Sequence, residues 1–307
     1  MLTGLIILNY NTYEETISCV TSIQKYTTVS YQIYLIDNAS PDHSGQKLKA
    51  LYQNESTVKI ILSENNLGFS GGNNLGILCA LSDGCDVIYF LNSDITLTND
   101  CIRFMNQKLE EDLNISAVGP NTVYPDGSRS QFARKPLVLS SYLFEKKPFS
   151  VLFQKKCHTL REYDYGADKD FLFPGMCAGC FFGLRRDFIQ KHNLLDDTIF
   201  MFYEEDTLAH LIQSDRKSCC IVSAAHAVHV EGKSVEKTKG GRLLFTRMYR
   251  WPSSLYVLWK YAGVSKTLCK LLAFNDKIIW RIIGIKKRTY KESYGNFSKE
   301  LKRLLNS

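Results

Sequence analysis

The stretch Val87–Asp94, VIYFLNSD, decides the fold, because a run of apolar residues ends there in three polar ones. A short apolar run bounded by polar turn residues is typical of a buried strand. The pattern also occurs upstream, where Leu5–Leu8 precedes Asn9-Tyr10-Asn11 and Gln32–Ile36 precedes Asp37-Asn38. We therefore expect three buried strands, each with polar residues at its carboxyl end.

The segments between these strands have the spacing of helices. Apolar residues recur every three positions at Ile17, Val20 and Ile23, which predicts a helix over Glu14–Lys25 with Thr12 at its N-cap. Further helices are expected over Gly45–Tyr52, Gly72–Leu81 and Asn99–Glu111, and further strands over Val58–Leu62 and Ser116–Gly119. Strands that alternate with helices form a mostly parallel sheet covered by helices on both faces. The sequence therefore predicts an α/β domain.

Five polar residues fall at the carboxyl ends of the predicted strands: Asn9, Asn11, Asp37, Asn38 and Asp94. Ligands of open α/β sheets bind outside this edge. Each residue alone is as well explained as a turn former, since Asn and Asp favour turns. The five together predict a ligand site.

The second half of the chain is less regular. Asp126-Gly127 predicts a hairpin, Cys180–Leu184 a short strand and Arg186–His192 a short helix. Residues 136–172 are aromatic and basic without a clear period, and we interpret them as a mobile or acceptor-facing insertion. From about Leu243 onward, apolar residues at helical spacing alternate with Lys and Arg, which predicts a helical C-terminal region.

The charge of the chain is unevenly distributed. The 307 residues carry a net charge of +7, but residues 233–307 alone hold 18 Lys and Arg against 4 Asp and Glu. A basic tail on a mildly acidic body predicts an anionic partner for the tail. No apolar run reaches the ~20 residues of a membrane-spanning helix, so none is expected.

The ten cysteines follow no regular spacing, and the opening residues lack the basic and small-residue pattern of a secretory signal. We therefore expect free thiols in a reducing cytosol. Cys177 and Cys180 form one C-x-x-C without a second ligand pair. Two small buried thiols explain it better than a zinc or redox site.

Two motifs suit an activated phosphate ligand. Asp94, at the end of Asn92-Ser93-Asp94, could hold a divalent cation, although a polar turn would also explain this tripeptide. Glu64–Asn74, ENNLGFSGGNN, contains glycines that let a backbone approach a ligand and a helix start that suits an anion. Its asparagines favour hydroxyl and amide ligands such as sugars, whereas the alternative is a flexible loop.

Two more motifs offer acid–base and metal-binding groups. The acids in Phe200–Asp206, FMFYEED, could accept a proton from an attacking hydroxyl, or they could offset the dipole at a helix start. His229 could ligate a metal or contact phosphate. For His226 we favour a structural, hydrogen-bonded role.

These motifs, in this order, resemble glycosyltransferase family 2, which has a GT-A fold, and most closely its rhamnosyltransferase-like branch. The matching segments are Ile6–Asn11, Leu35–Ser40, Asn65–Asn74, Leu91–Asp94, Ala178-Gly179-Cys180, Glu204-Glu205-Asp206 and His229-x-x-Gly232-x-Ser234. The resemblance implies a GT-A catalytic domain over residues 1–240, with a mostly parallel central sheet flanked by helices. Residues 241–307 would form a basic helical appendage.

The resemblance also implies a role for each matching residue. Glu205 would be the general base, or Asp206 if the alignment shifts by one residue. Asp94 would bind Mg²⁺ or Mn²⁺, with His229 beside the metal or the diphosphate. The nucleotide-sugar would contact the remaining residues, which are Asn9, Tyr10, Asn11, Asp37, Asn38, Asn65, Gly68, Asn73, Asn92 and Glu204.

The implied reaction is a metal-dependent, inverting transfer of one sugar from a nucleotide diphosphate. The donor would be dTDP-rhamnose or, alternatively, a UDP-hexose, and the acceptor a lipid-linked glycan or polysaccharide of the cell surface. The enzyme would be cytoplasmic, and its basic tail, with Trp251, Tyr256, Trp259 and Trp280, would contact the inner membrane leaflet. A solvated helical bundle that caps the catalytic domain explains the tail equally well.

Three other functions fit the sequence less well. A non-catalytic nucleotide- or glycan-binding module of the same fold is the main alternative, and the acids at Asp94 and residues 204–206 argue against it. A dinucleotide-dependent oxidoreductase needs glycines after the first strand, where Asn9–Tyr13 has none. Nucleic-acid binding is not expected, because the tail has no recognition motif and the body is acidic.

Overall fold

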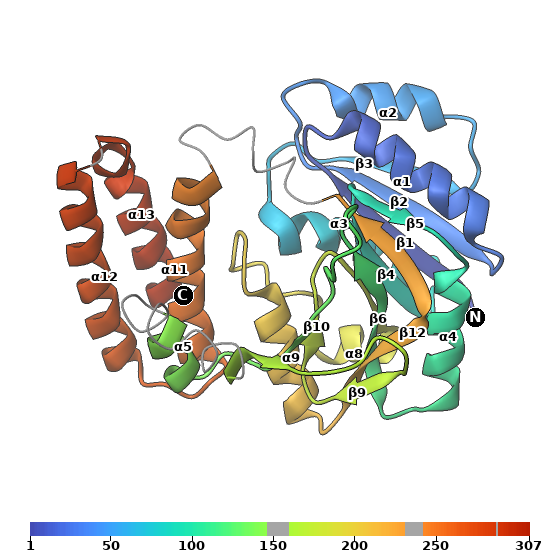
Figure 1. Cartoon of the computed structure of the whole chain (residues 1–307). Helices are drawn as coiled ribbons and strands as arrows, with labels where there is room; N and C mark the ends of the chain where they lie inside the picture. Colours follow the sequence, from blue (N-terminus) through green and yellow to red (C-terminus); the bar gives the residue numbers. More distant parts are fainter. Residues whose placement is uncertain (146–159, 231–241, 287) are drawn as a thin grey trace.

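The chain is seen in a computed structural model that describes residues 1–145, 160–230, 242–286 and 288–307 (Figure 1). Its first four strands pair in parallel in the order β3-β2-β1-β4. They are β1 (Thr3–Asn9), β2 (Tyr31–Asp37), β3 (Val58–Leu62) and β4 (Val87–Asn92). The helices between them are α1 (Tyr13–Tyr26), α2 (Ser44–Tyr52) and α3 (Gly68–Ser82). This βα alternation confirms the predicted α/β class.

The central sheet is buried on both faces. In β1, Leu5 and Ile7 pack into one apolar layer with α1, α2 and α4 (Cys101–Glu111), whereas Ile6 points into the opposite layer with α3. Alternate side chains of a strand point to opposite faces, so a strand covered on both sides must be apolar throughout. This explains the uninterrupted apolar runs in the sequence.

The second half of the chain extends the sheet to nine strands, in the order β3-β2-β1-β4-β11-β6-β12-β5 with β9 beside β12. The added strands are β5 (Ile95–Leu97), β6 (Ile115–Val123), β9 (Phe171–Phe173), β11 (Phe181–Arg185) and β12 (Ser218–His229). β11 runs antiparallel between β4 and β6. The sheet is therefore mixed, and the sequence analysis does not predict β5, β9 or β12.

A small second sheet lies beside the main one, in the order β10-β7-β8. Its strands are β7 (Ala133–Arg134), β8 (Glu162–Tyr163) and β10 (Met176–Cys177). Helices α5 (Leu139–Glu145), α8 (Arg186–Lys191) and α9 (Glu204–Ser214) complete this half. The predicted hairpin is present, since Gly127 donates its N–H to the carbonyl of Tyr124. Residues 146–159 of the predicted insertion lie outside the described part.

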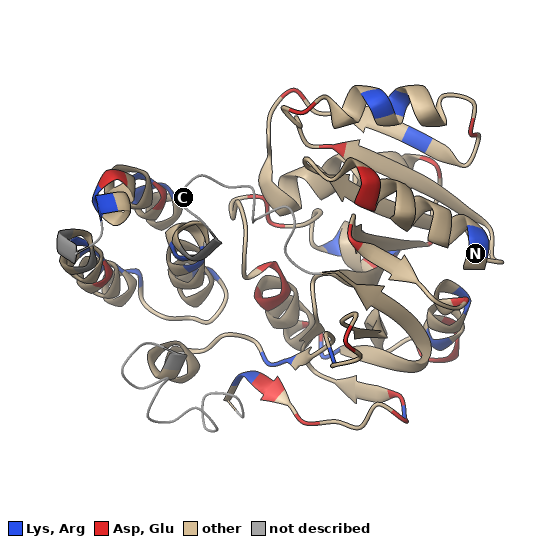
Figure 2. Ribbon diagram, turned by 45° about the horizontal axis from the view of Figure 1, so that its top comes forward, with Lys and Arg blue, Asp and Glu red and all other residues tan. Residues whose placement is uncertain are grey.

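The C-terminal region forms three packed helices, α11 (Arg242–Lys260), α12 (Lys266–Lys286) and α13 (Arg288–Asn306). Figure 2 looks nearly along these helices and shows Lys and Arg on all three. In the described residues, no helix is long and apolar enough to cross a membrane.

The tail aromatics that we had assigned to a membrane interface are largely core residues. Trp280 is fully buried and stacks on Phe297 with ring centroids 4.2 Å apart, and Tyr256 is 2% exposed. Trp251 packs edge-on against the same two rings. This part of the prediction was wrong, because the helices need these large side chains to pack against each other.

The helical region is joined to the sheet through residues 196–203. Tyr256 and Tyr261 both donate hydrogen bonds to Asp196, at 2.8 and 2.7 Å. Ile199 and Tyr203 lie in the same apolar cluster as the tail helices. The two parts of the chain therefore share a core.

Candidate active site

Asn9 is the centre of a buried polar network at the carboxyl edge of the sheet. Its side-chain N–H₂ donates to Asp37 Oδ1 at 2.6 Å and to Ser44 Oγ at 2.9 Å, and its side-chain oxygen accepts from the hydroxyls of Thr12 and Thr16. Asn9 is fully buried. Its amide therefore fixes the ends of β1 and β2 relative to α1 and α2.

Asp37 is committed to the same network. It accepts from the hydroxyl and the backbone N–H of Ser40, at 2.6 and 3.1 Å. Tyr10 and Asn11 instead lie partly exposed on the rim, where Asn11 has a φ of 59° and donates its backbone N–H to Ser40. Of these predicted nucleotide contacts, the accessible side chains are thus Tyr10 and Asn11.

Asn38 fixes the glycine-rich loop. Its Oδ1 accepts the N–H of Leu67 at 2.9 Å, and its Nδ2 donates to the Gly68 carbonyl at 3.0 Å and to Asn66 Oδ1 at 3.1 Å. These bonds satisfy backbone groups at the start of a helix, which otherwise lack partners. They explain why α3 begins at Gly68, four residues before the predicted Gly72.

Gly68 is required by both conformation and space. Its φ is +74°, and a Cβ there would lie 2.1 Å from the carbonyl oxygen of Phe200. The same carbonyl accepts the N–H of Phe69 at 2.9 Å. Asn73 is 1% exposed and donates to the Phe69 carbonyl, whereas Asn65 is exposed on the loop.

Asp94 and His229 meet across the sheet edge. Asp94 lies in the turn between β4 and β5, and His229 ends β12, where it pairs with Ile95. The Asp94 Oδ1 and His229 Nε2 atoms are 3.4 Å apart, and each side chain is 10% exposed. His229 Nδ1 is hydrogen-bonded to the hydroxyl of Ser130 at 3.1 Å. A hydrogen bond to the other ring nitrogen, like this one, orients the imidazole of metal-bound histidines.

This pair fits a divalent metal. Asp94 Oδ1 is buried and accepts no hydrogen bond from the described residues. Burial opposes a charge on His229, but its electrostatic interactions with Asp94 and Cys180 outweigh burial and raise its pKa to about 10. A proton therefore occupies the position where a cation would bind, and a cation would displace it.

Among the described residues, no cluster of three or more His, Cys, Asp or Glu side chains could hold a metal. Mg²⁺ is commonly held through one or two carboxylates, with waters and substrate phosphates in the other positions. Asp94 supplies one such carboxylate, and His229 lies beside it. The partly buried Asn92 lies two residues before Asp94, at the end of β4.

The three consecutive acids form the first turn of α9, and each has a different environment. Asp206 is fully buried and makes two 2.9 Å contacts with the guanidinium of Arg161, with Arg134 at 4.0 Å. Glu205 is partly exposed and accepts the backbone N–H of Gly179 at 3.1 Å.

Glu204 has a third environment. Its Oε1 is buried and has no hydrogen-bond partner in the described residues. Burial and the neighbouring charge of Glu205 raise the pKa of Glu204 to about 8. Near neutral pH Glu204 therefore keeps its proton.

The turn at Gly179-Cys180 brings the acids and the metal pair together. Gly179 contacts Glu205, and a Cβ on this glycine would lie 2.7 Å from Glu205 Oε1. The Cys180 carbonyl accepts the N–H of Asn92 at 2.9 Å, and the Cys180 thiol contacts His229. A carboxylate and a potential metal site thus flank one short turn.

Other predicted residues lie apart from this centre. His226 is exposed, and its backbone N–H donates to Asn99 Oδ1, so the structural role of its side chain stays a prediction. Gly232 and Ser234 fall outside the described residues. Sequence reasoning missed Ser130 and Arg161, because neither belongs to a motif and both reach their partners from distant segments.

Comparison with known proteins gives the family. The family described as "Glycosyl transferase family 2" matches residues 5–192. The chain belongs to this family. It is 28% identical over 110 residues to "Glycosyltransferase GlyG" of Streptococcus pneumoniae serotype 4 (strain ATCC BAA-334 / TIGR4), a match that covers 36% of each protein. It is 22% identical over 257 residues to "Low-salt glycan biosynthesis hexosyltransferase Agl10" of Haloferax volcanii, with 82% of this chain and 76% of that protein covered.

Solved structures support the fold of this family 2 member. GalNAc-T7 with UDP, GalNAc and Mn²⁺ superposes with a TM-score of 0.56 at 15% identity, over 84% of this chain and 50% of the other. S. aureus TarS 1–349 in complex with UDP-GlcNAc gives 0.52 at 12% identity, over 84% and 65% of the two chains. The predicted GT-A type, with a sheet flanked by helices and a helical C-terminal region, is thereby confirmed.

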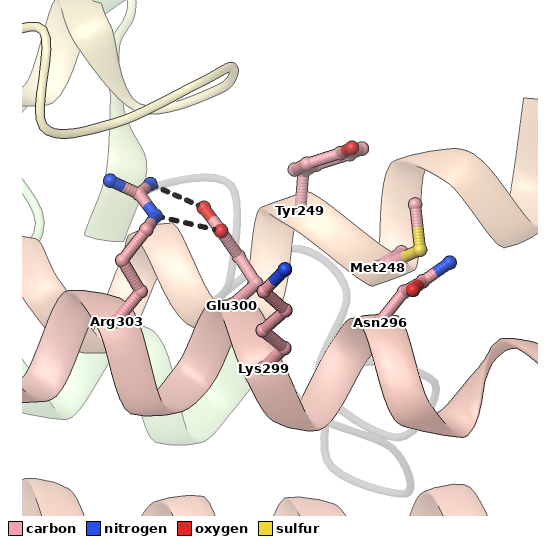
Figure 3. Close-up of a pocket in the computed structure, with 6 residues that line it drawn as sticks. All are labelled: Met248, Tyr249, Asn296, Lys299, Glu300 and Arg303. Carbon is pink, nitrogen blue, oxygen red and sulfur yellow. Dashed lines mark hydrogen bonds and ion pairs between the residues drawn. The ribbon is translucent and has the colours of Figure 1, made fainter.

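The family 2 chain also has a cavity of about 440 Å³ between α11 and α13 (Figure 3). It is lined by Met248, Tyr249, Asn296, Lys299, Glu300 and Arg303. Arg303 is paired with Glu300 and also donates to the Thr198 carbonyl. The Tyr249 ring stacks on Phe200, whose carbonyl holds the glycine-rich loop. The cavity is thus separate from the Asp94–His229 pair but adjoins the segment that supports that loop.

Proposed function

We propose that this chain transfers one sugar from a nucleotide diphosphate to a hydroxyl of a glycan, with inversion at the anomeric carbon. The observation that carries the proposal is the arrangement around Gly179-Cys180. A partly exposed Glu205 lies on one side of this turn, and the Asp94–His229 pair lies on the other. Such a transfer needs a base for the acceptor and positive charge at the leaving diphosphate.

We assign the base to Glu205. A general base must be able to reach the proton that it accepts. Asp206 is fully buried and held by Arg161, which supports a structural role for it. Glu205 is partly exposed, and the Gly179 N–H orients its carboxylate.

We assign the metal to Asp94 and His229, with Mg²⁺ or Mn²⁺ as the ion. A bound cation would supply positive charge to the diphosphate oxygens as the nucleotide leaves. The solved GalNAc-T7 structure with Mn²⁺ supports a divalent metal in this fold. Ser130 would hold His229 in the orientation that presents Nε2.

The nucleotide would lie along the carboxyl edge of the sheet. In this proposal Tyr10, Asn11, Asn65 and Asn92 contact the donor directly, and Glu204 lines the site beside Glu205. The buried Asn9, Asp37, Asn38, Gly68 and Asn73 shape the loops that the donor enters. We propose dTDP-rhamnose as the donor, and UDP-hexoses are the alternative that the UDP-bound neighbours support.

We further propose that the acceptor is a lipid-linked or polysaccharide glycan of the cell surface, used at the cytoplasmic face of the membrane. The cavity between α11 and α13 supports an acceptor path on this side, because Tyr249 adjoins the segment that holds the donor loop. An aromatic ring with neighbouring polar groups suits a sugar.

A donor screen tests the function. Purified protein with Mg²⁺ or Mn²⁺ is incubated with dTDP- and UDP-sugars, and metal-dependent hydrolysis and the shift in Tm are measured. We expect one donor to stabilise the protein by mass action, and Asp94→Ala to abolish the effect. Binding without turnover for every donor and a range of glycan acceptors would instead favour a non-catalytic module.

A further inference from the structure

Helix α12 carries an apolar stripe that no other described part of the chain covers. Leu271, Phe274, Ile278 and Ile282 are 63%, 65%, 41% and 55% exposed. Their spacing of three, four and four residues places all four on one face of the helix. Single exposed apolar residues are common, but four aligned large ones mark an interaction surface.

The opposite face of α12 is the one that packs into the protein. Cys269, Ala273 and Trp280 are buried there against α11 and α13. In Figure 1, α12 lies at the edge of the molecule, with α11 and α13 between it and the central sheet. The stripe therefore points away from the catalytic half.

The charges beside the stripe are positive. Lys270, Lys277 and Arg281 lie along one edge of it, each within four residues of a stripe residue. The single acid of α12 is Asp276, which is fully buried and accepts a hydrogen bond from Tyr142. The outward face of α12 is thus apolar in the middle and cationic along one side.

We propose that α12 lies in the surface of an anionic lipid bilayer, with the four stripe residues among the acyl chains and the three cations at the lipid headgroups. An amphipathic helix with a cationic polar face binds membranes in this way. Charge complementarity selects lipid over a second apolar protein surface, because an anionic leaflet attracts adjacent Lys and Arg. The proposal rests on the proposed function only in that a lipid-linked acceptor would then be met at the same surface.

The test is co-sedimentation of the full chain with vesicles. Phosphatidylcholine vesicles are compared with vesicles that contain about 30% phosphatidylserine, at low and high salt. We expect at least tenfold tighter binding to the anionic vesicles, weakened by salt. L271S/F274S/I278S should bind at least tenfold less, because apolar burial in the bilayer is lost. K270Q/K277Q/R281Q should lose the preference for anionic lipid.

The matched control is L51S/L78S/L113S, which removes three exposed leucines from the sheet domain. It should bind vesicles like the wild type. Equal vesicle binding by the wild type and L271S/F274S/I278S would overturn the proposal. So would self-association in sedimentation velocity that this variant abolishes while vesicles bind neither protein. Donor-induced stabilisation is measured on the same variants, so failure of the membrane proposal is distinguishable from failure of the transferase proposal.

Discussion

Glu205 and Asp206 are adjacent in sequence, yet their side chains have different tasks. The partly exposed Glu205 accepts one backbone N–H, whereas the fully buried Asp206 neutralises Arg161. We predict that Glu205→Gln lowers the transfer rate by ~10²–10⁴-fold with little change in stability. Asp206→Asn should lower the free energy of unfolding by about 3–5 kcal/mol, because it leaves a buried guanidinium without its counter-charge.

Transfer rates with the donor from the screen, together with urea unfolding of both variants, check this assignment. Donor-induced stabilisation should survive in Glu205→Gln, since the carboxamide retains the size of the side chain. If Asp206→Asn proved fully stable but inactive, and Glu205→Gln active, the base would be Asp206.

Glu204 gives a pH dependence of stability. Its pKa rises from 4.5 to about 8 on folding, so between these values the folded state binds more protons than the unfolded state. The contribution of Glu204 to the free energy of unfolding is therefore greatest below about pH 4.5, and it is lost as the pH rises towards 8. We predict that Glu204→Gln, which cannot ionise, has a Tm advantage over the wild type that grows with pH across this range.

Thermal unfolding at several pH values measures the Tm difference between this variant and the wild type. Glu64→Gln is the control, because it makes the same substitution at an exposed position. A pH-independent difference for Glu204→Gln would show that folding does not shift the pKa of Glu204.

At the scale of elements, the start of α3 depends on Gly68. Its φ is +74°, and an added Cβ would lie 2.1 Å from the Phe200 carbonyl oxygen. Gly84 has a similar φ of +84° but open space around it. Gly84→Ala should therefore cost only the left-handed backbone conformation, about 1–2 kcal/mol. Gly68→Ala should cost a further ~1–3 kcal/mol from the clash and should weaken donor binding.

Urea unfolding and donor titration of the two variants separate these effects. The comparison isolates the close approach to Phe200, since the backbone term is common to both. Equal stability and equal donor affinity in the two variants would mean that the loop shifts away from Phe200 without consequence.

Strands β1, β2 and β4 were predictable because each is buried on both faces. Val58–Leu62 was predicted with the bounds of β3, since an apolar run between polar turns has few alternatives. The site residues at the strand ends followed from the same pattern. The sequence did not reveal that the Asn9 side chain would be hydrogen-bonded inside the protein, because those bonds depend on the hydroxyls of Thr16 and Ser44.

The second half was predictable only in part, and β12 shows why. This strand is rich in Cys, Ala and Ser, which have weak strand preference, and its register with β6 shifts between Val222 and His226. Pattern reasoning also could not find Arg161 as the partner of Asp206, because the two are 45 residues apart. In the tail, Trp280 and Phe274 are both large and apolar, yet Trp280 is buried and Phe274 is exposed. Only the face of α12 on which each residue lies distinguishes them.

At the scale of the whole molecule, residues 196–203 connect two regions that the sequence divides at about residue 240. Phe200 holds the glycine-rich loop through its carbonyl and stacks its ring on Tyr249 of α11. Ile199 and Tyr203 belong to the apolar cluster of the tail helices. A change in the glycine-rich loop should therefore alter the stability of the helical region.

This coupling can be measured because all three tryptophans, Trp251, Trp259 and Trp280, lie in α11 and α12. Tryptophan fluorescence thus reports on the helical region, whereas far-ultraviolet circular dichroism reports on the whole chain. We predict coincident urea transitions by the two probes for the wild type, since coincidence marks a single cooperative unit. Gly68→Ala should move both midpoints down together, although Gly68 lies far from any tryptophan in sequence. A fluorescence midpoint that stays at the wild-type value while the dichroism midpoint falls would show that the helices unfold independently of the sheet.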